Sequence, residues 1–346
     1  MIRGTPVPSC HLPYETDADP GLGCDMDILI VKTSSLGDVV HNLPMVSDIH
    51  AQLPNARIDW LVEKAFADIP ALHPAIRTVI PLELRRWRHA SWQRRTWQEF
   101  AKFRTRLRQT PYDLILDSQG LLKSALIARL GVGPVYGPDR QSARETLAAC
   151  FYQRGVSVPL HLHAVWRNRT LGAGALNYPV PTTPPDYGLV VPSPTVTWPR
   201  PHCVALHASS RASKLWVPGH WVTLGKELSR QDLITLLPSG NAEEQKAAQD
   251  IACAIGPNAF ALPRMSVREL AAVIGAAHAV IGVDTGLVHL AAALKRPTVG
   301  IFCDSDPAQT GVLAQEGAIS LGGFHAQPSV DEVARALRQL GVLGPP

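Results

Sequence analysis

The feature of this sequence that most restricts its fold is the alternation of short apolar segments with segments of helical spacing. The continuous apolar runs in 27–32 ("DILIVK") and 57–62 ("RIDWLV") predict buried strands. Between them, 39–53 predicts one amphipathic helix, because apolar side chains recur on one helical face: Val39, Leu43, Val46 and Ile49. Strands that alternate with helices form parallel sheets with helices on both faces. The chain is therefore predicted to belong to the α/β fold class.

A proline-rich segment divides this alternation into two series. Eight prolines fall in the 23 residues from Pro179 to Pro201, a density that interrupts long helices and central strands. The alternation restarts after it, and 346 residues suffice for two domains of ordinary size. We therefore predict two Rossmann-like domains with a ligand cleft between the carboxyl ends of their strands. The predicted parts are a disordered N-terminal extension (1–25), a first domain (26–180), a proline-rich linker (181–201) and a second domain that ends in a helix (202–346).

Cysteine content and hydropathy restrict the setting in which the chain works. Its six cysteines form no CxxC pair and no spacing typical of a zinc site, which predicts a reducing cytoplasm and no metal. The longest apolar candidate, 270–283, is shorter than the ~18 residues that span a bilayer and is interrupted by His278. Residues 1–25 lack the patterns of targeting peptides. A cytoplasmic protein that does not span a membrane is predicted.

Positive charge is concentrated in one segment of the first half. The whole chain has a net charge of +4, but 85–108 contains eight arginines and one lysine against the single acid Glu99, with Trp87, Trp92 and Trp97 between them. A solvated basic helix and a nucleic-acid site are the alternatives, and the sequence lacks modules typical of nucleic-acid binding. An acidic, membrane-anchored substrate at an anionic membrane surface fits the charge and the aromatic residues together.

Two polar turns of the second half follow apolar strands and suit phosphate. Asp284-Thr285-Gly286 leads straight into a helix, whose free amide groups and positive end favour a diphosphate. The alternative for this turn is an ordinary helix start with Asp284 as the N-cap. His289 lies near the same helix end, and by itself it is typical of a histidine packed in the core.

The other turn offers two hydroxyls and a mobile ammonium to phosphate, from Ser209, Ser210 and Lys214, or is a solvated serine-rich loop. Neither turn matches a P-loop, and GxGxxG is absent from the sequence.

A third turn carries two adjacent acids. Glu243 and Glu244 open a helix after a predicted strand, where a carboxylate can accept hydrogen bonds from ribose hydroxyls. Two acids at a helix start are also typical of simple complements to the helix dipole.

Six ordered blocks of the sequence together resemble the lipopolysaccharide heptosyltransferases of glycosyltransferase family nine, from Met26 to about Pro307. They are "ILIVKTSSLGDVVHNLP", "RRWRHA", "DSQGLLKSA", "SARETLAACFYQR", "HASSRASKLW" and "GVDTGLVHLAAAL". The resemblance implies the GT-B fold and inverting, metal-independent transfer of L-glycero-D-manno-heptose from ADP-heptose to the first Kdo of Kdo-lipid A, without a cofactor. Alternatives are a heptosyltransferase with a different core acceptor, a nucleotide-sugar epimerase of the same fold, and a non-catalytic nucleotide-binding protein.

The resemblance also implies roles for individual residues. Asp38, in an S-x-G-D turn, falls on the general base, with a purely structural cap as the alternative; Lys214 falls on the group that neutralises the leaving ADP. The implied donor-binding set is Ser209, Ser210, Lys214, Glu243, Met265, Asp284, Thr285, Gly286 and His289, with serines where the family pattern has threonines. A one-residue deletion leaves Glu244 as a rival to Glu243 at the ribose. The implied acceptor-binding set is Arg85, Arg86, Arg88, Gln119, Lys123 and Arg144.

The resemblance places the protein on the cytoplasmic face of the inner membrane as a peripheral protein. Its implied partners are ADP-heptose, Kdo-lipid A and the anionic membrane surface, and nucleic acid is not among them.

Overall fold

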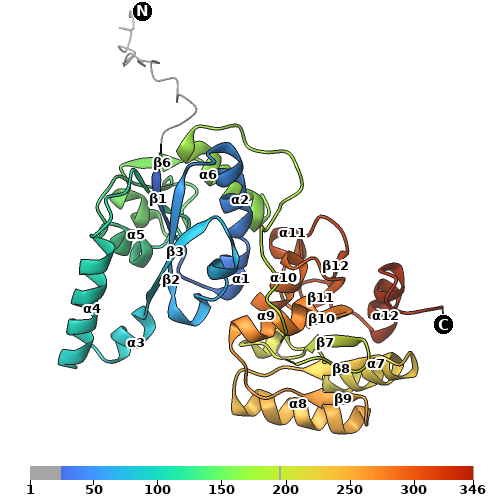
Figure 1. The fold of residues 1–346 in the computed structure, drawn as a ribbon. Coiled ribbons are helices and arrows are strands. Elements are labelled where there is room, and N and C mark those ends of the chain that lie inside the picture. Colours follow the sequence, from blue (N-terminus) through green and yellow to red (C-terminus); the bar gives the residue numbers. More distant parts are fainter. Residues whose placement is uncertain (1–24, 195, 346) are drawn as a thin grey trace, which may run out of the picture.

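The computed structural model describes residues 25–194 and 196–345, so the prediction for residues 1–24 lies outside the described part. Two six-stranded parallel sheets form the frame of the molecule (Figure 1). The first contains β1 (Asp27–Val31), β2 (Arg57–Glu63), β3 (Ile76–Leu82), β4 (Leu114–Asp117), β5 (Val135–Pro138) and β6 (Arg154–Val156). The second contains β7 (His202–Leu206), β8 (Ile234–Leu237), β9 (Ala259–Ala261), β10 (Ala279–Val283), β11 (Thr298–Phe302) and β12 (Ala318–Gly322).

Both sheets have the strand order of a dinucleotide-binding domain. The first runs β3-β2-β1-β4-β5-β6, and the second repeats this order as β9-β8-β7-β10-β11-β12. The α/β class with two Rossmann-like domains, predicted from the alternation of strands and helices, is therefore confirmed. The residue bounds given to the domains and to the linker stay a prediction.

Helices cover the faces of both sheets. The first half contributes α1 (Leu36–Val40), α2 (Leu43–Gln52), α3 (Leu84–His89), α4 (Arg94–Leu107), α5 (Leu122–Ala128) and α6 (Ala164–Leu176). The second contributes α7 (Pro218–Arg230), α8 (Ala242–Ile255), α9 (Val267–Gly275), α10 (Gly286–Ala293), α11 (Pro307–Thr310) and α12 (Val330–Gln339). In Figure 1, α1 and α2 lie on the side of the first sheet that faces the second domain. Among residues 25–194 and 196–345, no helix has the length and apolar content to cross a membrane.

The single helix predicted over 39–53 is wrong, because the structure divides it into α1 and α2. Pro44 lies in the first turn of α2, where its missing N–H costs nothing, whereas in a continuous helix it would remove the hydrogen bond to Val40. The predicted apolar face is nevertheless formed, since Val39, Leu43, Val46 and Ile49 are fully buried. The break leaves α1 and α2 as two separate helices that both pack on the core.

The two domains meet where α1 and α10 cross. One continuous apolar core includes Val39 of the first domain and Val288 of the second. At the crossing Gly37 and Gly286 touch, because a Cβ atom added to Gly286 would lie 2.7 Å from the Gly37 amide nitrogen. The start of each helix therefore lies against the start of the other.

The chain between α6 and β7 is tied to both domains. Buried Arg169 of α6 pairs with both carboxylate oxygens of Asp48 of α2, at 2.7 and 3.0 Å, and donates to the Thr183 carbonyl at 2.7 Å. The Tyr187 hydroxyl donates to the Leu313 carbonyl of the second domain at 2.7 Å. These contacts position the first domain on the second.

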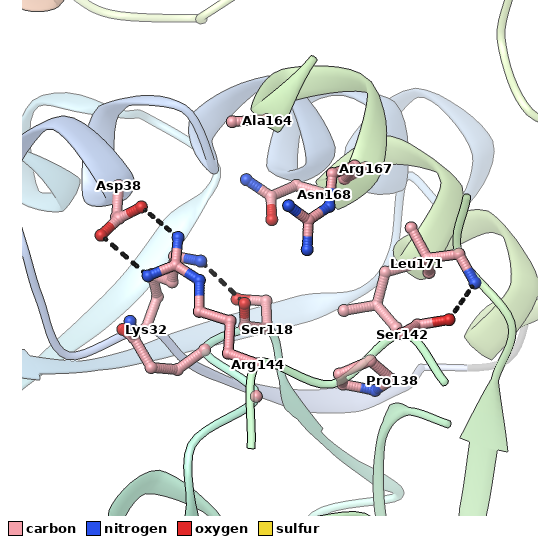
Figure 2. Close-up of a pocket in the computed structure, with 13 residues that line it drawn as sticks. Lys32, Asp38, Ser118, Pro138, Ser142, Arg144, Ala164, Arg167, Asn168 and Leu171 are labelled. Atoms are coloured by element: carbon pink, nitrogen blue, oxygen red, sulfur yellow. Dashed lines mark hydrogen bonds and ion pairs between the residues drawn. The ribbon is translucent and has the colours of Figure 1, made fainter. Parts of the chain in front are cut away.

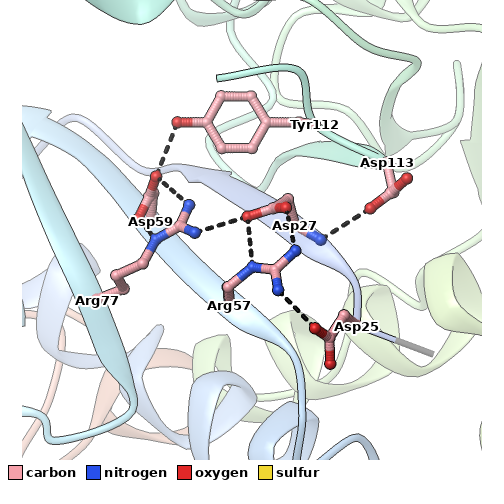
Figure 3. Close-up of polar contacts among 7 residues, drawn as sticks. All are labelled: Asp25, Asp27, Arg57, Asp59, Arg77, Tyr112 and Asp113. Carbon is pink, nitrogen blue, oxygen red and sulfur yellow. Dashed lines mark hydrogen bonds and ion pairs between the residues drawn. The ribbon is translucent and has the colours of Figure 1, made fainter. Parts of the chain in front are cut away.

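Charged residues at the amino ends of the first sheet neutralise one another (Figure 3). Arg57 and Arg77 both bind Asp27, Arg77 also binds Asp59 at 2.8 Å, and the Tyr112 hydroxyl donates to Asp59 at 2.9 Å. The hydrogen bond from Arg57 is the main reason that the pKa of Asp27 is lowered. This network stabilises the strand starts and lies at the edge opposite the loops discussed next.

Candidate active site

The loops that follow the central strands of each sheet converge on one cleft. Strand order reverses between β1 and β4 in the first sheet and between β7 and β10 in the second, and ligands of such sheets bind beside the carboxyl ends at this point. A cavity of about 520 Å³ lies there between the domains. Of the residues predicted for the site, it is lined by Asp38, Arg85, Ser209, Ser210, Lys214, Asp284, Thr285, Gly286 and His289. Residues up to about 250 positions apart in the sequence therefore share one cavity.

Asp38 is the third residue of α1 and faces this cavity. Its Oδ2 accepts hydrogen bonds from the Ser35 amide at 2.9 Å and the Ser35 hydroxyl at 3.2 Å, so it does cap the helix. Its Oδ1 also accepts a hydrogen bond from Arg144 at 2.7 Å, and its side chain is 19% exposed (Figure 2). Burial would raise the pKa of Asp38, but the charges of Lys32 and Arg144 hold it well below its usual range. The carboxylate is ionised and accessible, as a proton acceptor must be.

Three cations surround Asp38 on its inner side. Lys32 is buried and donates to the Ser118 carbonyl at 2.7 Å, and burial lowers its pKa to about 8. Lys32, Arg144 and Arg167 line a pocket of about 40 Å³ next to Asp38, and Arg167 has a buried Nε atom without a partner among the described residues (Figure 2). Asp38 neutralises only one of these three cations, so the pocket keeps a net positive charge that favours an anionic ligand.

Gln119 positions the loop before Asp38. It is buried, and its Oε1 accepts hydrogen bonds from the amides of Thr33 and Ser34 at 3.1 and 3.2 Å. The backbone N–H of Gln119 in turn donates to the carboxylate of buried Asp117 at 2.9 Å. The structure therefore places Gln119 in support of the turn that carries Asp38.

Lys214 and Asp284 form the centre of the second-domain half of the cleft. The Lys214 ammonium is paired with Asp284, which also accepts a hydrogen bond from the Ser305 hydroxyl at 2.7 Å and lies 3.5 Å from the His289 Nε2 atom. Burial would raise the pKa of Asp284, but hydrogen bonds from His289, Lys214 and Ser305 hold it well below its usual range. Asp284 thus fixes the position of Lys214 at the cavity wall.

The alternative role of Asp284 as a helix cap is wrong. The residue that precedes α10 as its N-cap is Thr285, whose backbone is extended. The buried Thr285 hydroxyl has no hydrogen-bond partner within the described residues. An unpartnered hydroxyl beside free amide groups at a helix start is suited to bind an anion.

Five residues of the predicted site line neither this cavity nor the smaller pocket beside Asp38, which Gln119 and Arg144 line. Glu243 is exposed outside it, whereas Glu244 lines it and accepts a hydrogen bond from the Gly240 amide at 2.7 Å. Met265 packs against the core of the protein, and Lys123 is exposed on α5. Arg86 and Arg88 lie on the exposed side of α3, where Arg86 pairs with Glu83 and Glu99.

The structure adds residues that the sequence did not single out. They are Lys32, His41, Arg167, Arg211 and Ser305. Of these, only Lys32 could have been identified from the sequence. It is a charged residue directly after an apolar strand, and so lies at the carboxyl end of that strand, where ligands bind. The others lie in helices or loops of ordinary composition, so only the tertiary contacts single them out. Within the part of the chain that the structure describes, no group of three or more His, Cys, Asp or Glu residues could hold a metal ion.

Comparisons with known proteins agree with this geometry. The profile of glycosyltransferase family 9 (heptosyltransferase) matches residues 100–338. Lipopolysaccharide heptosyltransferase 1 of Pseudomonas aeruginosa is 44% identical over 288 residues, which cover 83% of this chain and 81% of that protein. The protein of the same name from Escherichia coli is 41% identical over 83% of this chain and 90% of its own length.

A solved structure is similar over nearly the whole described chain. E. coli heptosyltransferase WaaC with ADP is 37% identical, with a TM-score of 0.85 over 91% of this chain and 100% of that one. This likeness confirms the GT-B fold that the sequence resemblance implied. The chain belongs to glycosyltransferase family 9, the heptosyltransferases.

Proposed function

We propose that this enzyme transfers L-glycero-D-manno-heptose from ADP-heptose to the first Kdo of Kdo-lipid A, with inversion, in the synthesis of the lipopolysaccharide inner core. The observation that carries the proposal is the single cavity lined by Asp38 from one domain and by Lys214, Thr285 and Gly286 from the other. The relatives at 40–44% identity are lipopolysaccharide heptosyltransferases 1, whereas heptosyltransferase 2 of E. coli is 23% identical, which favours the first acceptor over another core sugar.

ADP-heptose is proposed to bind to the second domain (202–346), across the linker (181–201) from the first. Its diphosphate accepts hydrogen bonds from the free amides at the start of α10 and from the hydroxyls of Thr285, Ser209 and Ser210. The structure of WaaC with ADP supports a nucleotide-sugar donor. We assign the contact to the ribose to Glu244, because it lines the cavity and Glu243 does not.

Kdo-lipid A is proposed to bind to the first domain (26–180), with its anionic groups toward Arg85 and Arg144. Asp38 accepts the proton of the attacking Kdo hydroxyl while the new C–O bond forms on the anomeric carbon of heptose. The bond to the diphosphate breaks on the opposite face, and Lys214 and the α10 amides stabilise the negative charge of the departing ADP. No cofactor or metal takes part in this scheme.

Arg144 connects acceptor binding to the strength of the base. Before the acceptor arrives, Arg144 donates to Asp38 and lowers its pKa. An acceptor carboxylate that takes over Arg144 weakens this pair, and the pKa of Asp38 then rises toward that of a better base. In this scheme the pKa of Asp38 is highest when the acceptor is bound.

The proposed place of action is the cytoplasmic face of the inner membrane, where the protein binds peripherally. The basic residues of α3 and α4 support this, because anionic lipids attract clustered arginine and lysine.

The direct test is incubation with ADP-heptose and Kdo-lipid A, with ADP release and product mass measured against a control without acceptor. We expect ADP release that depends on the acceptor and a product heavier by one heptose. Turnover only with an acceptor that already carries heptose would identify a different core enzyme. A changed sugar without acceptor would identify an epimerase.

A further inference from the structure

We propose that α3 and α4 form a hairpin that inserts Trp92 and Trp97 into the interface of an anionic phospholipid bilayer. The inference rests on the proposed function in one respect, namely that the acceptor is anchored in a membrane. It goes beyond that function in assigning the insertion to two particular side chains and in predicting binding to bilayers that contain no acceptor.

The two tryptophans are unusually exposed. Trp92 is 77% exposed, the largest value for a large hydrophobic side chain among the described residues, and Trp97 is 63% exposed. Trp87 of the same hairpin is 9% exposed and packs on the rings of Phe100 and Phe103 at centroid distances of 5.8 and 5.5 Å. The hairpin is therefore a packed unit that holds two of its three indole rings away from the protein.

Hydrogen bonds fix the tip of the hairpin. The Thr96 hydroxyl donates to the Ala90 carbonyl at 2.8 Å, and the Trp97 indole N–H donates to the Ser91 carbonyl at 2.8 Å. The polar group of Trp97 is thus satisfied within the protein, and its exposed surface is carbon. An aromatic ring of this kind is suited to the headgroup region of a bilayer.

The charge along the hairpin is positive and mostly unpaired. Glu83 and Glu99 are the two acids of 83–108, and both are bound by Arg86. Seven cations of the hairpin form no ion pair within the described part of the chain: Arg85, Arg88, Arg94, Lys102, Arg104, Arg106 and Arg108. An external anionic surface is the partner that complements this charge together with exposed tryptophan.

The hairpin is placed so that insertion would bring the active site to the lipid surface. α3 follows β3 and so lies at the same edge of the sheet as the loop that carries Asp38, and Arg85 of α3 lines the cavity itself. In Figure 1, α3 and the start of α4 project at the lower left, beyond the body of the first domain. A lipid-anchored acceptor can therefore enter the cavity without leaving the bilayer.

The test is flotation of the purified protein with vesicles of phosphatidylglycerol and phosphatidylcholine, compared with vesicles of phosphatidylcholine alone. We expect binding to the anionic vesicles, and a loss of about tenfold or more in affinity for the double variant Trp92→Ser/Trp97→Ser, because two indole rings no longer leave water. Phe324→Ser is the matched control, since Phe324 is 64% exposed in the second domain, and it should bind like the wild type. Trp92→Ser alone, which breaks no hydrogen bond of the hairpin, should lose part of the affinity.

Salt separates insertion from attraction by charge alone. At about 1 M salt the Debye length is about 3 Å, so binding that remains there depends on apolar contact. The wild type should keep a measurable fraction of its binding, and the double variant should lose it. Equal binding of wild type and double variant, absence of binding to anionic vesicles, or tighter binding to single-stranded RNA than to vesicles would overturn the proposal.

Turnover on two acceptors separates this inference from the proposed function. The double variant should transfer heptose to a water-soluble, delipidated Kdo acceptor as fast as the wild type, and more slowly to Kdo-lipid A in vesicles. A wild type that binds vesicles but transfers no heptose would refute the proposed function and leave the membrane surface supported. Equal loss of turnover on both acceptors would refute insertion as the role of the tip.

Discussion

At the scale of single residues, the contacts of Asp38 combine two demands that usually conflict. A general base has to be ionised at neutral pH, and it also has to bind a proton well in the transition state. Arg144 and Lys32 satisfy the first demand by lowering the pKa of Asp38, and they oppose the second. Arg144 is also the proposed binding group for the acceptor. Asp38 is therefore ionised before the acceptor binds and becomes a stronger base once Arg144 has turned to the acceptor.

Asp38→Asn is expected to remove turnover and to leave donor binding nearly unchanged. Asparagine keeps the size of the side chain and the capping oxygen but cannot take a proton, and a general base contributes about 10² to 10⁴ in rate. ADP release gives the turnover, and calorimetry with ADP-heptose gives the affinity. A variant that retained more than about a tenth of wild-type turnover would show that Asp38 is only a helix cap.

Lys214→Ala is expected to weaken donor use and to slow transfer. The ammonium is held at the cavity wall by Asp284, and its proposed role is to meet the charge that grows on the leaving diphosphate. Loss of one such preorganised group costs about 10² to 10³ in turnover. EDTA should leave the wild-type rate unchanged, because Lys214 and the α10 amides supply the positive charge; a loss with EDTA that magnesium restores would refute this mechanism.

At the scale of elements, the crossing of α1 and α10 decides how the two halves of the site meet. Both helices begin at the end of a central strand, and glycine at each start lets the backbones touch. Asp38 on α1 and the start of α10 thus line one cavity.

Gly286→Ala is expected to lower turnover, to raise the Michaelis constant for ADP-heptose and to lower the melting temperature. The new methyl group would lie 2.7 Å from the Gly37 backbone nitrogen, so the helices have to separate. Gly219→Ala at the start of α7 is the matched control, because its methyl group meets nothing within 4 Å. If both variants keep wild-type kinetics, close contact of α1 and α10 is not required for catalysis.

At the scale of the whole molecule, buried histidines make stability depend on pH. Burial lowers the pKa of His41, His73, His163, His202 and His207, and for His73 the value falls to about 4. The His73 Nδ1 atom accepts a hydrogen bond from the Ala75 amide at 3.2 Å, so Nε2 carries the proton that is donated to the Ser47 hydroxyl at 3.0 Å. The folded state therefore needs this ring neutral.

The free energy of unfolding is expected to fall as the pH decreases from about 6.5 toward 4. Below the ordinary histidine pKa the unfolded chain binds protons that the folded chain does not, so acid favours unfolding. His73 alone accounts for up to about 3 kcal/mol of this loss. Urea unfolding at several pH values measures the slope, which should be smaller for His73→Asn; an identical slope would show that His73 titrates normally.

Local patterns in the sequence were sufficient to predict two parallel α/β domains and the turns that carry the site. Apolar periodicity determines which side of each element is buried, and in parallel sheets all strand ends of one kind meet at one edge. Asp38, Lys214 and Thr285 could be singled out for this reason, since each follows an apolar strand. These are properties of a few neighbouring residues, and they can be read without knowing the rest of the fold.

Only the tertiary structure decided which side chains meet within the site. Arg144 reaches Asp38 from 106 residues away and Lys214 reaches Asp284 from 70, and these pairs depend on strand order. Adjacent Glu243 and Glu244 look alike in the sequence, but the turn before α8 directs only Glu244 to the cavity. The physical reason is that burial and charge pairing depend on packing between distant segments, which no local pattern records.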